Sequence, residues 1–529
     1  MSKKYFDIHK PVFWPAVILI VIFIAVTLIV GEPMEKIFEN TQSAISENAG
    51  WIFIVAINIF IIFCFYIGFS KFGNIRLGGK DAKPEFSTLA WFSMLFSAGM
   101  GIGLLFWGVA EPIQHYSNAP KGESYTVEAA ESAMNLTFLH WGFHAWAIYA
   151  LVALALAFFA YNRKKPLTIR SVFYPILGDR IYGWIGDMID VLAVLATLFG
   201  LATSLGIGVQ QIGGGISYLT GIANNEWLQV GLIGGITLIA TISVVSGIDK
   251  GVKFLSEWNV RIAGILLLFV IIAGPSLFIF KSLVQNIGNY MNDVLAVATW
   301  TEAYEGTNWQ GSWTVFYWAW WVSWSPFVGM FIARVSRGRT IRQFVFGVLL
   351  VPTLLTFLWL TTFGGSAIWL DLQAGDNVLA NTINEDNAKA LFVFLEEFPV
   401  SIVGIVVAVL LVMSFFVTSS DSGSLVIDSI TAGGKLDAPV GQRVFWALSE
   451  GLVAAVLLWG GGLTALQTAA IITGLPFLAV LIIMCFSLVQ GLRKEYAREK
   501  ELDKEKDREG YEKRLAQVIT KNIEKNRKS

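Results

Sequence analysis

The sequence is poor in charge and in cysteine. Charged residues make up 15% of the 529-residue chain, whereas soluble domains usually carry about 25%. Hydrophobic residues account for 55%, and the mean hydropathy is +0.62. These values exclude an ordinary soluble domain and predict an integral membrane protein. The two cysteines, Cys64 and Cys485, lie in apolar segments, so we expect no disulfide framework.

Few of the groups that enzymes use are present. The chain has four histidines and no thiolate cluster. His140 and His144 are four residues apart, as in a metal pair, but without further ligands in the pattern we interpret them as structural. The glycine run at 99–103 is not a phosphate loop, because no Lys-Ser/Thr follows it and no strand precedes it. We therefore expect a protein that is not an enzyme, and we expect no nucleic-acid partner.

Long apolar segments dominate instead. A bilayer-crossing helix needs ~20 apolar residues, and twelve segments of roughly that length can be marked. They lie at 12–30, 51–70, 88–109, 136–160, 188–219, 228–247, 262–280, 313–335, 344–366, 394–418, 443–460 and 465–491. No small-residue cleavage pattern follows the first, so we expect a retained helix rather than a signal peptide.

Lys and Arg are unevenly distributed between these segments. They gather before the first segment and in the even-numbered connections, for example at Arg163, Lys164 and Lys165, whereas the connection at 31–50 is rich in glutamate. Cytoplasmic loops of membrane proteins carry the excess of Lys and Arg. The pattern predicts that the even-numbered connections and both termini face the cytoplasm.

The segments divide into unequal groups. We expect a tail with two lead-in helices at 1–87, five spans at 88–280, an external connection with an amphipathic helix at 281–312, five more spans at 313–491, and a charged tail at 492–529. An odd number of spans per unit forces the two five-span units into opposite topology, which is the plan of inverted-repeat transporters.

Both five-span units are expected to begin with an interrupted helix. Glycines at 99–103 interrupt the first, and Ser323-Trp324-Ser325-Pro326 interrupts the second. Proline lacks a backbone donor and clashes with the preceding turn, so the helix should open at Pro326 and free carbonyl groups.

The tail from Arg493 onward carries thirteen Lys or Arg and nine Asp or Glu. Such a segment is either a solubilising end or a regulatory arm that senses anionic lipid or salt.

Tryptophan is concentrated in two of the spans. Four tryptophans lie within residues 318–324, and Trp141, Trp146 and Tyr149 fall on one broad face of the fourth span if its helix is undistorted. Tryptophan faces attract quaternary ammonium groups. Aromatic packing or an interfacial belt is the alternative, but the mid-span position beside an expected helix break favours an aromatic cage. Because no acidic side chain lies in the glycine break, the pattern favours a zwitterion over a bare cation.

Hydroxyl groups recur near the cytoplasmic half of the tenth span, at Thr418, Ser419 and Ser420, and again at Thr197 in the fifth. Hard cations such as sodium prefer oxygen ligands. Serine and threonine in membrane helices also bond to their own helix, so these residues alone leave the ion site open.

Taken together, these motifs resemble the betaine/choline/carnitine transporter family over nearly the whole span region. The resemblance rests on the tryptophan run with residues 327–342 after it, and on the glycine motif with Glu111-Pro112 after it. The chain looks most like the sodium-coupled glycine betaine branch. This implies an all-α membrane protein of twelve transmembrane helices, with a leucine-transporter-type 5+5 inverted repeat after two extra helices, and commonly a homotrimer.

The resemblance also implies site residues. The family's aromatic box carries over to Trp141, Trp146, Tyr149 and Trp321, with Trp320 and Trp324 lining the pathway and Gly99, Gly101 and Gly103 approaching the substrate. One sodium site carries over to Ser97, Met100, Phe415, Thr418 and Ser419, and a second to Thr197 and Phe327. Leu201 stands where the second site has its other hydroxyl, which puts that site in question.

The expected function is sodium-coupled symport of glycine betaine, or a similar zwitterionic ammonium or sulfonium osmolyte, by alternating access in a bacterial inner membrane. Choline carriers of the family tend to have an acid where Gly103 stands, which favours betaine. A sodium-independent carnitine or choline exchanger is one alternative, disfavoured by the intact Thr418 and Ser419. An osmotic receptor that binds without transporting is another.

Overall fold

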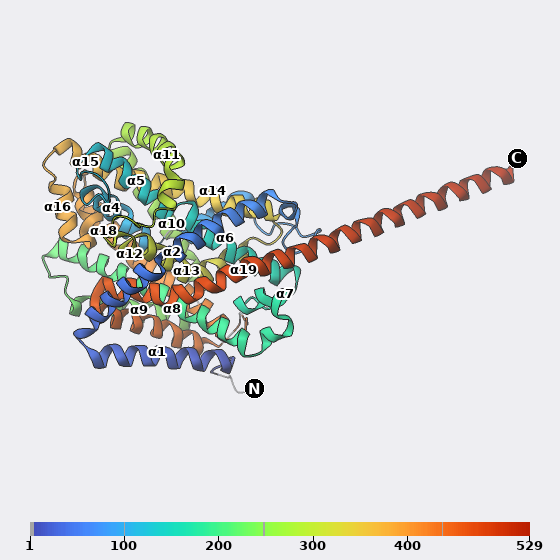
Figure 1. Cartoon of the computed structure of the whole chain (residues 1–529), viewed down its shortest axis with the longest axis horizontal. Helices are drawn as coiled ribbons and strands as arrows, with labels where there is room; N and C mark the ends of the chain where they lie inside the picture. Colours follow the sequence, from blue (N-terminus) through green and yellow to red (C-terminus); the bar gives the residue numbers. More distant parts are fainter. Residues whose placement is uncertain (1–4, 100, 247–248, 436, 438, 529) are drawn as a thin grey trace.

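A computed structural model describes residues 5–99, 101–246, 249–435, 437 and 439–528. Within these ranges the chain is almost entirely helical, and strand pairing is limited to one isolated bridge between Arg76 and Thr340. The helices pack around one another, and the C-terminal part of α19 projects from them as a single long helix (Figure 1). The all-α expectation is confirmed.

In chain order the longer helices are α1 (Lys10–Val30), α2 (Pro33–Phe69), α3 (Thr88–Gly99), α4 (Ile102–Ser117), α5 (Val127–Trp141), α6 (Phe143–Ala157), α8 (Trp184–Thr220), α9 (Glu226–Ser246), α10 (Asp249–Ala273), α11 (Ser276–Ala298), α13 (Thr314–Val335), α14 (Ile341–Leu360), α15 (Ser366–Ala374), α16 (Val378–Glu385), α18 (Ser401–Thr431) and α19 (Val440–Lys528). Shorter helical pieces are α7 (Tyr174–Leu177), α12 (Trp309–Ser312) and α17 (Ala390–Glu396), with π-helical turns at Phe158–Asn162 and Thr361–Gly365.

Nine helical stretches in the described part of the chain are long and apolar enough to cross a membrane. They extend along the chain from Lys10–Val30 to Val440–Thr520. Many of their outward side chains are large and apolar, such as Ile29, Ile62 and Ile272, which are 84%, 66% and 77% exposed. Apolar surface of this kind suits a lipid environment rather than water, so the chain is a multi-pass membrane protein.

Two of the predicted segments lie in a single helix. The segments at 443–460 and 465–491 both fall in α19, which is divided at Gly461 and Gly462, where φ is +157° and +55°. The helix then continues through the charged tail to Lys528 without a break at residue 492. Near its base, Glu495 forms an ion pair with Arg163 at 3.2 Å, and Asp503 pairs with Lys80.

The glycine break is confirmed. Helix α3 ends at Gly99, α4 begins at Ile102, and Gly101 between them has an extended backbone with φ −165° and ψ −172°. Met100 lies outside the described residues.

The expected break at Pro326 is wrong, because α13 is continuous from Thr314 to Val335 with this proline inside it. Proline deprives the carbonyl of Val322 of its normal helical donor. The hydroxyl of Ser325 donates to that same carbonyl oxygen at 2.7 Å. The side chain therefore replaces the missing backbone donor, and the helix continues through Pro326.

A second break, not expected from the sequence, lies at Gly142 between α5 and α6, where φ is −96° and ψ is −139°. A Cβ atom there would lie 2.4 Å from the carbonyl oxygen of Phe138 and 2.8 Å from the ring of Phe357, so only glycine fits. Trp141 and Trp146 consequently lie on different helices. Their placement on one face of an undistorted helix is therefore wrong.

Helix α13 occupies the interior of the bundle. It packs against α6, α8 and α19, while α4 packs against α5 and α8. The tryptophan run, the glycine break and the joint at Gly142 therefore meet inside the protein rather than at its surface.

The role of Ser325 can be tested with a double-mutant cycle. Ser325→Ala should lower the stability of the purified protein by about 1–3 kcal/mol, because it leaves the buried Val322 carbonyl without a donor. Adding Pro326→Ala should recover most of that loss, since an alanine in place of the proline would supply the backbone N–H. Melting temperatures of the four proteins in detergent give the comparison, and a double variant no more stable than Ser325→Ala would contradict the account.

Candidate functional site

An aromatic pocket lies where α4, α5, α6 and α13 meet. Eight of the nine residues expected at a substrate site line it together: Gly101, Gly103, Trp141, Trp146, Tyr149, Trp320, Trp321 and Trp324. Leu104, Ala145, Ser204 and Thr356 complete the lining. Gly99 is the last residue of α3, one side of the break that brings Gly101 to the pocket.

The rings of the pocket meet at close range. Trp141 and Trp321 are edge to face with centroids 4.9 Å apart, and Trp320 stacks on Trp321 at 4.8 Å. Tyr149 lies 5.5 Å from Trp146 and 6.2 Å from Trp321, in both cases edge to face. Several ring faces therefore converge on one small space, as binding of a cation through aromatic rings requires.

Hydrogen bonds fix the tryptophans of α13. Trp321 donates its indole N–H to the carbonyl oxygen of His140 at 2.9 Å. The indole N–H groups of Trp320 and Trp324 donate to Ser204 Oγ and to the carbonyl oxygen of Gly200, both at 3.1 Å. The polar edges of these rings are therefore tied to α5 and α8, while the stacked rings of Trp320 and Trp321 cover one face of each other.

The free volume of the pocket is about 30 Å³, whereas one enclosed water molecule needs ~10–15 Å³. A trimethylammonium group needs more room than a water molecule. We call this arrangement of the rings the closed form of the site.

Gly103 is in tight contact with the cage. A Cβ atom at this position would lie 2.6 Å from Trp320 and 3.1 Å from Trp141. At Gly101 the nearest atom to a Cβ would be on Trp324 at 3.8 Å, an ordinary contact. The two glycines thus differ: Gly103 sets the space between two rings, whereas Gly101 has room for a methyl group.

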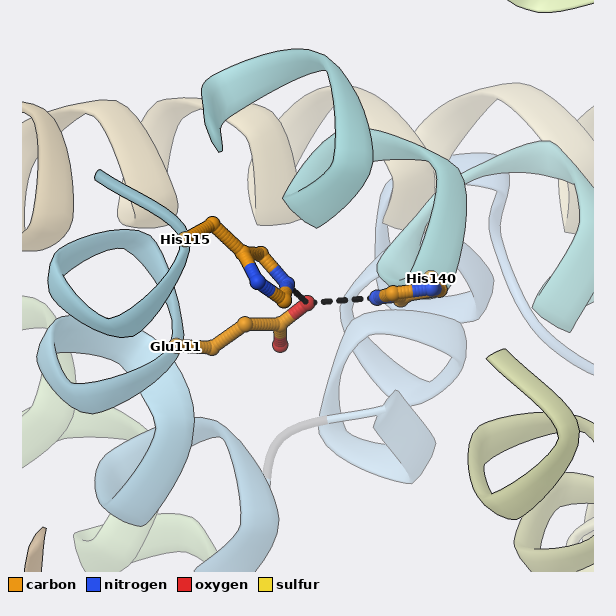
Figure 2. A group of neighbouring side chains, drawn as sticks. All are labelled: Glu111, His115 and His140. Carbon is orange, nitrogen blue, oxygen red and sulfur yellow. Dashed lines mark hydrogen bonds and ion pairs between the residues drawn. The ribbon is translucent and has the colours of Figure 1, made fainter. Parts of the chain in front are cut away.

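Behind the cage lies a buried carboxylate that the sequence analysis quoted only as part of a motif. Glu111 of α4 is fully buried. Its Oε2 accepts hydrogen bonds from Trp141 Nε1 at 2.6 Å and from Tyr317 Oη at 2.5 Å. Its Oε1 lies 2.6 Å from His140 Nδ1 and 3.3 Å from His115 Nε2, and Figure 2 shows both rings turned toward it. We call these five residues the Glu111 cluster.

One carboxylate oxygen and two imidazole nitrogens of this cluster lie within 4.8 Å of one another, a donor set that could hold a metal ion. Their present contacts are hydrogen bonds, and the second nitrogen of His140 is also engaged, 3.0 Å from Thr314 Oγ1. We therefore interpret the group as a hydrogen-bond network. His144, the other half of the pair considered from the sequence, turns away and lies 3.4 Å from Asn58 Oδ1.

The residues expected at the first sodium site are placed on two helices. Phe415, Thr418 and Ser419 lie on α18, and Ser97 lies on α3. The hydroxyl of Thr418 is within hydrogen-bond reach of the carbonyl oxygens of Ser414 and Phe415, at 3.1 and 3.2 Å. It also accepts from Asn259 Nδ2 of α10 at 3.3 Å.

At the expected second site, Thr197 on α8 donates to the carbonyl oxygen of Ala193 at 2.7 Å, and Phe327 lies on α13. Leu201 is fully buried and packs against α18, because a Cβ on Gly423 would lie 2.4 Å from its side chain. An apolar contact thus occupies the place of the second hydroxyl.

The sequence analysis gave no site role to three polar residues: Glu111 and Tyr317 beside the cage, and Asn259 beside Thr418. A signal for Glu111 was present, because an acidic residue that closely follows the apolar segment 88–109, with histidine four positions later, is costly to bury unless it is paired. No pattern linked Tyr317 or Asn259 to their partners, which lie far away in the sequence.

Comparison with known proteins agrees with this geometry. A family model described as betaine/carnitine/choline family transporter matches residues 11–497. Glycine betaine transporter OpuD of Bacillus subtilis is 44% identical over 496 residues, which cover 93% of this chain and 96% of that protein.

Two proteins of Vibrio parahaemolyticus are also similar. Glycine betaine transporter 1 is 48% identical over 503 residues, covering 94% of this chain and 96% of the relative. A glycine betaine/proline/choline/ectoine transporter is 49% identical over 504 residues, covering 94% and 89%.

The different fit of the two glycines predicts different effects of a methyl group. Gly103→Ala should weaken binding of tetramethylammonium by about tenfold, because relieving overpacking of the rings costs ~1–3 kcal/mol. Gly101→Ala is the matched control and should change it by less than about twofold. Quenching of tryptophan fluorescence in the purified protein measures both, and equal affinities of the two variants would contradict the assignment of Gly103 to the cage.

Proposed function

The chain belongs to the betaine/carnitine/choline transporter family, and from this premise we propose that it is a sodium-coupled symporter of glycine betaine or a closely similar zwitterionic osmolyte. The observation that carries the proposal is the aromatic pocket, in which Trp141, Trp146, Tyr149 and Trp321 converge beside a glycine break. Each desolvated cation–π contact contributes about 2 kcal/mol. The family and its relatives are transporters, which fits a protein that is not an enzyme.

Transport would proceed by alternating access. We propose twelve spans, with two five-span units of opposite topology around the midplane pocket. The small free volume of the cage in the closed form supports coupling of substrate binding to movement of α13 relative to α5 and α6. Opening on one side loads the site, and opening on the other releases the substrate.

Sodium is the proposed coupling ion. The site would use Thr418 and Ser419 with the carbonyl of Phe415 on α18, and Ser97 and Met100 on the third span. In the closed form the Thr418 hydroxyl oxygen accepts a hydrogen bond from Asn259 Nδ2, so a sodium ion there would use the second lone pair of that oxygen or replace the amide. One sodium charge moved through 100 mV supplies about 2.3 kcal/mol, or about 50-fold accumulation. Leu201 leaves the second site, at Thr197 and Phe327, with one hydroxyl fewer than it needs.

The setting of the transporter is also proposed. The Lys and Arg distribution favours cytoplasmic termini in a bacterial inner membrane. The basic excess of the α19 extension suits contact with anionic lipid. A homotrimer is the assembly that the family resemblance implies.

Uptake into proteoliposomes tests the proposed function. Labelled glycine betaine should accumulate when sodium is high outside, and should not accumulate when potassium replaces sodium. Accumulation without sodium would instead favour an exchanger. Binding without accumulation would favour an osmotic receptor, and either result would overturn the symporter.

The sodium dependence of uptake into the same vesicles distinguishes the two proposed ion sites. Thr418→Val should raise the sodium concentration needed for half-maximal uptake at least tenfold, because it removes a ligand oxygen. Thr197→Val should shift this sodium concentration less than about threefold, since Leu201 already leaves the second site without its other hydroxyl. Thr203→Val is the matched control, because among the described residues its hydroxyl contacts the carbonyl oxygens of Phe199 and Leu466. Equal shifts for Thr418→Val and Thr203→Val would contradict the α18 site.

A further inference from the structure

We propose that Glu111 determines the specificity of the aromatic pocket. Its ionised carboxylate positions Trp141 and Tyr317 and supplies, from behind the cage, the negative charge that selects ligands carrying a fixed positive charge. This inference rests on the proposed function and deepens it, because it explains how a pocket lined only by uncharged residues discriminates by charge.

Glu111 can accept every hydrogen bond made to it. Trp141 Nε1 can only donate, and it lies 2.6 Å from Oε2. Tyr317 Oη and His140 Nδ1 lie 2.5 and 2.6 Å from the two carboxylate oxygens, and His115 Nε2 completes the set at 3.3 Å. An ionised carboxylate can accept from all four groups, whereas a protonated one would have to donate to one of them. Hydrogen bonds to a charged acceptor are also the stronger kind.

The hydrogen bonds allow the cluster to carry a net negative charge. His140 can donate from Nδ1 and accept from the Thr314 hydroxyl at Nε2, at 3.0 Å. His115 can donate from Nε2, and its Nδ1 has no hydrogen-bond partner among the described residues. With both rings neutral, the one formal charge in the cluster is that of Glu111.

Trp141 connects the charge of Glu111 to the cage. This residue donates its N–H to the carboxylate and also lines the pocket. Donation to an anion raises the electron density of the indole ring, and so strengthens its attraction for a cation at its face. None of the described residues that line the pocket is charged. In a low-dielectric interior a buried carboxylate acts over a longer range than in water, so the charge of Glu111 can act on a cation bound in the pocket.

Glu111 also positions rings of the cage that come from different helices. Glu111 stands on α4, Trp141 on α5 and Tyr317 on α13. Tyr317 lies 5.9 Å from the Trp321 ring, and Trp141 lies 4.9 Å from it. The carboxylate therefore fixes two of the rings that flank Trp321, and it acts on the substrate through them. Glu111 is a positioning residue, because it does not itself line the pocket.

A pair of probes of one shape separates charge from structure. Glycine betaine carries a trimethylammonium group, and 3,3-dimethylbutanoate carries a tert-butyl group with the same carboxylate and no positive charge. Binding of each to the full-length protein in nanodiscs is measured by calorimetry or by competition with labelled betaine. Glu111→Gln should weaken betaine binding at least tenfold and should not weaken binding of 3,3-dimethylbutanoate, which lacks the positive charge. The betaine-to-isostere preference therefore falls.

Matched variants complete the design. Glu450 is also fully buried, bonds to Ser420 at 3.1 Å and does not line the pocket. Glu450→Gln should keep the parental preference. Trp141→Phe keeps a ring but removes the N–H that contacts Glu111, so the preference should fall, and adding Glu111→Gln should lower it little further. This second variant retains a test if Glu111→Gln does not fold.

The outcomes are distinct. Equal loss of both probes in Glu111→Gln, or a parental preference in Trp141→Phe, would overturn the charge-selecting role and leave Glu111 a structural residue. A parent protein that binds betaine while Glu111→Gln keeps the parental preference would overturn this inference alone. A parent protein that does not bind betaine would overturn the proposed function itself.

Discussion

The hydrogen bonds of one buried carboxylate hold the central helices in register. Glu111 extends from α4 to α5 through Trp141 and His140, and to α13 through Tyr317. A buried charge of this kind is costly unless it is fully paired, and here the donors come from side chains of the helices that line the pocket. The same contacts that pair the charge therefore fix the aromatic rings. Glu111 therefore contributes both to the packing of the interior and to the geometry of the site.

The backbone breaks have a related role. At Gly142 the chain leaves the helix where the Phe138 carbonyl and the Phe357 ring approach too closely for a side chain. At Gly101 the backbone is extended, although a Cβ atom there would have room. At Pro326 the chain remains helical because a neighbouring hydroxyl replaces the missing donor. The small free volume of the cage fits our proposal that α13 moves relative to the broken helices during transport.

Much of this was predictable from the sequence. The helical membrane class follows from composition, and the residues of the cage follow from tryptophan spacing and from the resemblance to the transporter family. The break at glycine was predictable because glycine has no Cβ to pack. The continuity at Pro326 was not, because the compensation depends on the rotamer of Ser325. Nor could the pairing of Glu111 with Tyr317 be predicted, since 206 positions separate them and only the packing of α4 against its neighbours unites them. Sequence patterns report local periodicity, whereas these contacts depend on tertiary geometry.

The most direct test of the account is an experimental structure of the protein with glycine betaine bound. The account predicts the trimethylammonium group between the rings of Trp141, Trp146, Tyr149 and Trp321, with the rings farther apart than in the closed form and the bond from Trp141 to Glu111 intact. Betaine bound elsewhere, with these rings still in contact, would contradict the central claim that this aromatic pocket is the transport site.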